Sequence, residues 1–176
     1  MKTSVLPSIH AVVLFVLVAV LAATPTGGRA DEAAVVDTQY TWDLTEFYAS
    51  KAAWTTELAR LRGEVDFLAP YAGKLGDDAA TLLAALEANS TYGRELSRLW
   101  TYASNLRNTN LGAPEGQEMV GRMQALAQSA SAAQSFFVPE IVSLGEARIM
   151  AFIAAEPGLE KHSLYLRDAL RQGEHV

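Results

Sequence analysis

Apolar residues in this chain recur at alternating spacings of three and four residues, which is the periodicity of an amphipathic α-helix. This pattern fills most of the sequence after residue 50, and no stretch alternates apolar and polar residues for long enough to predict a strand. The class predicted is therefore all-α, an antiparallel helical bundle or helical lobe of about five to six helices. The longest stripe consists of Met119, Met123, Leu126, Ala130, Ala133 and Phe137.

The first helix is expected to begin after Ser50, because serine is a preferred N-cap residue. Its apolar stripe runs as far as Leu68, and Pro70 and Gly73 are expected to end it. The stripe consists of Trp54, Leu58, Leu61, Val65 and Leu68.

Asp77 and Asp78 predict the start of the next helix, because an aspartate there both caps the backbone and meets the positive end of the helix dipole. Asn89 and Ser90 are expected to break or bend this segment, after which a second stripe runs from Tyr92 to Leu106. The composition of residues 108–113 predicts a loop, and Pro114 suits the first turn of the helix that follows.

Pro139 is expected to end or kink the long stripe near Phe137, because proline removes a backbone donor and crowds the preceding turn. Two shorter helical patterns follow, Glu146–Glu156 and Leu159–Arg171. Pro157-Gly158 separates them.

The N-terminus has the pattern of a secretory signal peptide. Lys2 precedes an uninterrupted apolar run, Ala11–Ala23, which is shorter than the roughly 20 residues needed to cross a bilayer. Cleavage is expected after Ala30, with Ala23 as the alternative site and an uncleaved anchor as the alternative interpretation. The chain is expected to be exported and to be periplasmic or secreted, with no membrane contact after signal cleavage.

Three regions are therefore expected. Residues 1–30 form the signal peptide, residues 31–49 a linker and an aromatic docking segment, and residues 50–176 a helical lobe. Removing residues 1–30 takes away Lys2 and Arg29 but no acid, so 12 basic and 20 acidic side chains remain and the formal charge is −8. This balance argues against a nucleic-acid partner, which would require clustered Lys and Arg.

The chain has no cysteine, which excludes disulfides, thiolate metal sites and a cysteine nucleophile. Catalytic zinc requires two imidazoles at ligand spacing on one helix face, a carboxylate base and a third ligand. His10 leaves with the signal peptide, and His162 and His175 are 13 residues apart, which is no ligand spacing. We expect both to be solvated surface residues, and we expect no catalytic, cofactor-binding or metal residue in this chain.

No G-x-S-x-G elbow or glycine-rich phosphate loop occurs, and helix capping accounts for the paired carboxylates Asp77 and Asp78. The large aromatic residues are expected to lie mainly in the core, with a ligand groove as the alternative. They are Trp42, Trp54, Trp100, Tyr102, Phe136 and Phe137.

Three further stretches are distinctive when taken together: Tyr40–Tyr48, which contains Trp-Asp-Leu, Leu96–Ser104, and Ser135–Ile141. They resemble the N-terminal part of the oligoendopeptidase F family, whose members are zinc metallopeptidases of the thimet-oligopeptidase type. The resemblance continues in order through Thr81–Glu87, Asn108–Asn110, Glu156–Leu159, Tyr165–Asp168, Arg171 and His175. Asn108 and Asn110 depart from the acidic residues that many relatives have in that loop.

In such enzymes the N-terminal helices form one wall of a deep channel over the zinc site, which restricts substrates to short peptides. The resemblance implies that this chain is truncated before the catalytic domain that carries the H-E-x-x-H helix. The fragment alone is then expected to be inactive, with zinc bound only in the full-length parent enzyme. The implied partners are the missing C-terminal catalytic domain and the parent enzyme's peptide substrates.

Two hypotheses remain. The chain is either the front lobe of an exported zinc endopeptidase, or a free-standing exported helical binding or adaptor module without catalysis. A front lobe is expected to expose apolar surface that its partner buries. The candidates are residues 40–48 and the small-residue face around Ala130 and Ala133.

Overall fold

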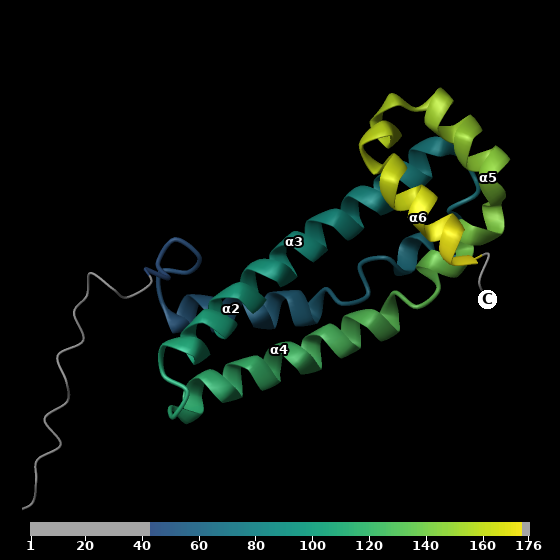
Figure 1. Ribbon diagram of the computed structural model, residues 1–176. Coiled ribbons are helices and arrows are strands. Elements are labelled where there is room, and N and C mark those ends of the chain that lie inside the picture. The colour runs from purple at the N-terminus through teal and green to yellow at the C-terminus, as the bar shows by residue number, and fades with distance from the viewer. Residues whose placement is uncertain (1–42, 174–176) are drawn as a thin grey trace, which may run out of the picture. The chain divides into compact units, whose positions relative to one another are not determined.

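The computed structural model describes residues 43–173, and the regular structure in that range is entirely helical (Figure 1). The predicted all-α class is confirmed, and the five α-helices of this range agree with the predicted number. The predicted signal peptide lies outside the described residues, as do Tyr40, Trp42 and His175. The elements are α2 (Lys51–Gly63), η2 (Ala69–Tyr71), α3 (Ala79–Thr109), α4 (Pro114–Ala133), α5 (Phe137–Ala155), η3 (Pro157–His162) and α6 (Ser163–Gly173).

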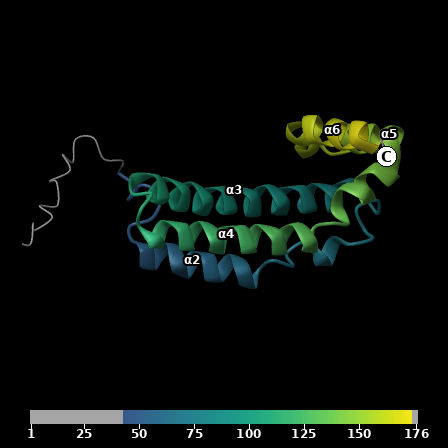
Figure 2. The ribbon, with the colours of Figure 1, turned by 60° about the horizontal axis from the view of Figure 1, so that its bottom comes forward.

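Helix α3 takes part in both hydrophobic cores of the described chain. Its C-terminal part contributes Leu99 and Ala103 to a core shared with α2 and α4, which lie beside it in Figures 1 and 2. Its N-terminal part contributes Leu82 and Leu86 to a second core, shared with α5, η3 and α6. Because α3 is one continuous helix, it links the two cores.

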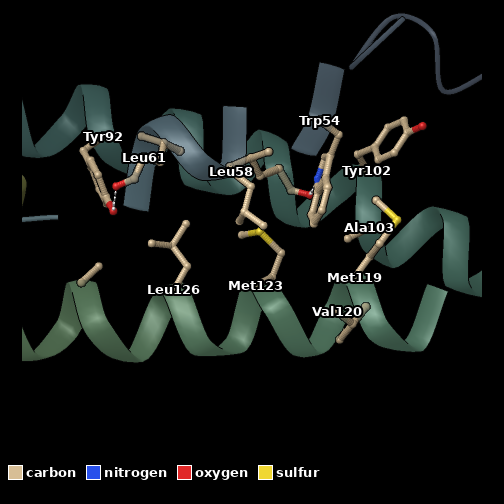
Figure 3. Packing of buried hydrophobic residues seen from close by; sticks show 12 residues of the cluster. Trp54, Leu58, Leu61, Tyr92, Tyr102, Ala103, Met119, Val120, Met123 and Leu126 are labelled. Carbon is tan, nitrogen blue, oxygen red and sulfur yellow. Dashed lines mark hydrogen bonds between the residues drawn. The ribbon is translucent and has the colours of Figure 1, made fainter. Parts of the chain in front are cut away.

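The first core is formed by side chains of α2, α3 and α4. Figure 3 shows Leu58 and Leu61 of α2 opposite Met123 and Leu126 of α4. The indole of Trp54 is fully buried at one end of this row. The predicted apolar residues from Trp54 to Leu61 therefore form the packed face of α2, and those from Met119 to Ala130 form the packed face of α4.

Helix α2 begins as predicted but ends earlier. The Ser50 side chain accepts a hydrogen bond from the amide of Ala53 at 3.1 Å, which confirms the N-cap. The helix ends at Gly63 and turns follow it, so the extension to Leu68 is wrong. Leu68 is buried, but in the second core, because the chain turns away from α2 after the poorly helix-forming glycine.

Helix α3 also differs from its prediction. Asp78 caps it by accepting from the amide of Thr81 at 2.7 Å, as predicted. The expected interruption at Asn89 and Ser90 is wrong, because helix α3 runs through both residues. Each side of that point is buried in a different core, and this tertiary packing outweighs the weak helix propensity of the two residues.

The connection between α3 and α4 is tight. Pro114 occupies the first turn of α4, as predicted. A Cβ at Gly116 would lie 2.6 Å from the backbone Cα of Arg107, so only glycine allows the end of α3 to approach the start of α4 this closely.

The long stripe of α4 ends at Ala133, and Phe137 begins α5 and lies in the second core. The expectation that the stripe ends or kinks near Phe137 is confirmed, because the break occupies residues 134–136. Pro139 lies in the first turn of α5, where the backbone N–H groups have no helical partner and proline is tolerated. In an unbroken helix its ring would crowd the carbonyl of Ser135.

Helix α5 is interrupted at Gly145, whose φ of 74° is in the left-handed region that favours glycine. The predicted helix Glu146–Glu156 is the part beyond this kink, whereas the part before it was not predicted. In the first turn, the Glu140 carboxylate accepts from the amides of Gly73 at 2.9 Å and Leu75 at 2.8 Å. This carboxylate ties α5 to the loop that precedes α3. The boundary at Pro157-Gly158 is confirmed, because η3 begins there.

Candidate functional site

A hollow among the described residues lies between α5 and α6, and we call it the α5–α6 groove. It consists of two adjoining hollows of about 680 and 320 Å³ that share Val142 and Gly173. Its lining residues are Val138, Pro139, Val142 and Glu146 of α5, and Leu164, Arg167, Leu170, Arg171, Gln172 and Gly173 of α6.

The groove exists because α6 packs on α5 by only one side. Leu166 and Ala169 face the second core and are buried. Leu164 is 69% exposed and lies on the rim of the groove. At the other end, Gly173 lies directly against Val142, so closely that a Cβ there would collide with the valine methyl groups. The result is an open surface lined by both apolar and charged side chains.

Charged side chains also line this groove. Arg171 pairs with Asp168 on the same helix, while Arg167 and Glu146 also contribute to the lining. Apolar and charged side chains together therefore line the groove. No acid–base or nucleophile pair occurs among the residues that line it.

A second hollow, the α3–η3 pocket, is polar and has a volume of about 430 Å³. Residues of α3 and η3 that are more than 60 positions apart in the chain meet there. Its lining residues are Glu87, Ser90, Thr91, Arg94, Lys161 and His162. Sequence reasoning missed this pocket, because none of these residues forms a motif with its neighbours in the chain.

This pocket combines residue types that serve nucleophilic catalysis elsewhere, but not their geometry. No hydrogen bond joins His162 to Ser90, Thr91 or Glu87 in the described structure. The Glu87 carboxylate instead pairs with Lys161, which lowers the pKa of Glu87. A nucleophile needs a base within hydrogen-bond reach, and the pocket does not supply one.

His162 is not the solvated surface residue that we expected. It is half-buried, and its Nε2 atom is sealed from solvent without a hydrogen-bond partner among residues 43–173. Burial, with a smaller effect of the Lys161 charge, lowers the pKa of His162. His162 is half-buried because η3 packs on α3, a contact between distant segments that the sequence pattern does not show.

The two surfaces expected to be apolar and uncovered are largely covered. Phe47 and Tyr48 pack against the first core, and the Tyr48 ring meets Tyr102 edge to face at 5.6 Å. Ala130 is only 2% exposed and Ala133 is half-buried. A shallow hollow of about 390 Å³ remains beside Ala130, between α3, α4 and the start of α5.

The large aromatic side chains lie mainly in the core, as expected. Trp54, Tyr102 and Phe137 are buried, and Phe136 is packed against the second core. Trp100 is the exception within the described range, with 40% of its surface exposed.

Residues 43–173 contain no group of three or more His, Cys, Asp or Glu side chains placed to hold a metal ion. Over the same range, no helix has both the length and the apolar character required to span a membrane.

Comparison with known proteins confirms the predicted resemblance to oligoendopeptidase F. The chain is 27% identical over 146 residues to Group B oligopeptidase PepB of Streptococcus agalactiae, covering 83% of this chain and 24% of that protein. It is 29% identical over 141 residues to oligopeptidase PepF of Bacillus subtilis, covering 80% of this chain and 21% of that protein. The plasmid-encoded oligoendopeptidase F of Lactococcus lactis is 27% identical over 107 residues, which cover 60% of this chain and 18% of that protein.

The chain thus spans about a quarter or less of the length of these relatives. No protein-family model matches it. A crystal structure of a candidate peptidase from Chlamydophila abortus has the same fold, with a TM-score of 0.70 over 81% of this chain and 24% of that one. Its sequence identity of 22% shows the likeness of the fold alone.

Proposed function

We propose that this chain is the helical front lobe of an exported zinc endopeptidase that cleaves short peptides, and that the lobe restricts access to a catalytic site carried elsewhere. The observation that carries the proposal is the mismatch of lengths. Relatives that are named oligopeptidases match four fifths of this chain, yet the chain spans less than a quarter of them. The remaining three quarters of such an enzyme can hold the zinc-binding helix.

The partner in this proposal is the catalytic part of the same enzyme, and its docking surface is the α5–α6 groove. Three exposed apolar side chains, Met150, Leu164 and Tyr165, lie on the two helices that form this groove. Of the three, Leu164 lines the groove itself, and exposed apolar residues are typical of a surface that another protein covers. Chain length supports this occupant, since the relatives have several hundred further residues to place.

A peptidase assay tests the catalytic part of the proposal. The full chain, supplied with zinc and quenched fluorescent peptides, should release no more product than a protein-free blank. The same chain extended through any downstream reading frame that encodes H-E-x-x-H should hydrolyse the peptides, and a chelator should abolish that activity. Chelator-sensitive hydrolysis by the 176-residue chain itself would contradict the proposal that the catalytic site is carried elsewhere.

Paired leucine substitutions test the docking surface. Leu164 and Leu111 are both 69% exposed, but only Leu164 lines the groove, whereas Leu111 lies in the α3–α4 loop. Leu164→Asp should reduce the binding of a hydrophobic dye and the self-association seen by light scattering. Leu111→Asp should leave both close to the unsubstituted chain. Equal effects of the two substitutions would contradict docking at the groove and would favour the free-standing module.

A further inference from the structure

The α3–η3 pocket has a cationic group that no carboxylate neutralises within the described structure. Glu87 is paired with Lys161, so these two charges offset each other. Arg94 donates from Nη2 to the hydroxyl of Thr91 at 3.0 Å, and its other N–H groups have no protein acceptor among residues 43–173. The pocket therefore carries a net charge of about +1, in a chain whose formal charge is −6.

Two neutral hydroxyls line the same hollow as this guanidinium. They belong to Ser90 and Thr91, which are consecutive residues of α3. His162 also lines it, but its sealed Nε2 disfavours a second charge there. Arg94, which is exposed, is thus the one charged residue of the pocket lining without an ion-pair partner among residues 43–173, since Glu87 and Lys161 pair with each other. A guanidinium offers two parallel N–H donors, which is the geometry that a carboxylate accepts.

The size and charge of the pocket select among oxyanions. One uncompensated positive charge matches a carboxylate, which carries one negative charge, whereas a phosphate monoester carries about two at neutral pH and would leave the pocket negative. The volume of about 430 Å³ exceeds what a carboxylate alone requires and leaves room for the residue that bears it.

We propose that the α3–η3 pocket binds the C-terminal carboxylate of a short peptide, with Arg94 as the carboxylate-binding residue and the Ser90 and Thr91 hydroxyls beside it. The choice of a peptide as the carrier of the carboxylate rests on the proposed function, whereas the carboxylate itself rests on the charge and the donors of the pocket. Arg94 and the hydroxyls act in binding only. The exposed Glu87–Lys161 pair joins η3 to α3 at this pocket.

Chemical-shift titration of the full chain tests this proposal with three probes. These are trialanine with a free carboxylate, trialanine with a C-terminal amide, and inorganic phosphate. Trialanine should shift the backbone signals of residues 87–94 and 161–162 with a dissociation constant on the order of 1 mM, as suits an open site with one charge-assisted pair. The amide and phosphate should bind at least about fivefold more weakly.

Two arginine variants distinguish binding by Arg94 from the effect of removing any positive charge. Arg94→Gln should weaken trialanine binding at least about fivefold. Arg62→Gln is the matched control, because Arg62 is an exposed helical arginine with no ion-pair partner in the described part of the chain. Equal binding of acid and amide, shifts outside the pocket, phosphate binding without trialanine binding, or an unchanged affinity in Arg94→Gln would each overturn the proposal. None of these results bears on whether a zinc-binding segment follows the chain, so the two proposals fail separately.

Discussion

The indole N–H of Trp54 donates a buried hydrogen bond to the backbone carbonyl of Leu99 at 2.9 Å. This carbonyl belongs to α3, so the bond joins α2 to α3 across the first core. The same pair of helices is joined at the other end of α2 by the Tyr92 hydroxyl, which donates to the Leu61 carbonyl at 3.1 Å (Figure 3). Both aromatic residues therefore combine apolar burial with a polar contact that fixes the register of the helices.

Trp54→Phe should lower the free energy of unfolding by about 2–3 kcal/mol, because it removes buried volume and deprives the Leu99 carbonyl of its side-chain donor. Trp100→Phe is the matched control, because Trp100 is 40% exposed, and it should change stability by no more than about 0.5 kcal/mol. Urea denaturation followed by circular dichroism measures both. A similar loss in the two variants would contradict the assigned role of Trp54.

Two glycines of α4 should respond to the same substitution with opposite signs. Gly116→Ala places a Cβ 2.6 Å from the Arg107 backbone and should destabilise the chain by about 1–3 kcal/mol through overpacking. Gly121→Ala meets nothing within 4 Å and should stabilise it by about 0.4–1 kcal/mol, because alanine is the better helix former. Thermal melting of the two variants decides between these outcomes. A stabilised Gly116→Ala chain would show that α3 and α4 do not approach as described.

Glu140→Gln should cost about 1–2 kcal/mol of unfolding free energy. The carboxylate accepts from two backbone amides, those of Gly73 and Leu75, whereas a glutamine has one acceptor oxygen and would turn its NH₂ group toward the other amide. Glu118→Gln is the control, since Glu118 is exposed on α4 and has no hydrogen-bond partner among the described residues. Guanidinium titrations should show the loss in the first variant alone.

Acidification should destabilise the chain through His162. Burial lowers the pKa of His162 in the folded state, so the unfolded chain, with an ordinary value near 6.5, binds the proton more readily. The contribution of neutral His162 to the free energy of unfolding is therefore fully present above about pH 7. It is lost as the pH falls through about 6.5 toward the lowered pKa of the folded state. The melting temperature should fall between pH 7.5 and 5.5, and this fall should be smaller in His162→Gln. An identical pH dependence in the two proteins would rule out His162 as its cause.

The sequence predicted most of the fold because helix caps and apolar stripes are local signals. Ser50, Asp78 and Pro114 each begin a helix at the predicted place. The errors occur where distant packing decides the outcome. The Asn89-Ser90 segment stays helical because both of its flanks are buried, and Leu68 continues the stripe of α2 in sequence but belongs to the other core.

The candidate sites were less accessible to sequence reasoning. Arg94 and Lys161, which line the α3–η3 pocket, are 67 positions apart in the chain. The Glu140 carboxylate and the Gly73 amide that donates to it are separated by the same interval. Neither pairing leaves a periodic or motif-like trace in the chain. The resemblance to oligoendopeptidase F was carried by short ordered stretches, several of which supply core residues such as Leu99, Tyr102 and Phe137. That likeness therefore indicates a shared fold more directly than a shared site.

The reading frame that follows the codon for Val176 tests the central claim most directly. If this chain is the front lobe of a zinc endopeptidase, the genomic sequence should continue in frame, or after a single frameshift, into a segment that encodes an H-E-x-x-H helix and several hundred residues in total. A stop codon at that point, with no H-E-x-x-H segment in any downstream frame, would contradict the claim and would favour a free-standing helical module.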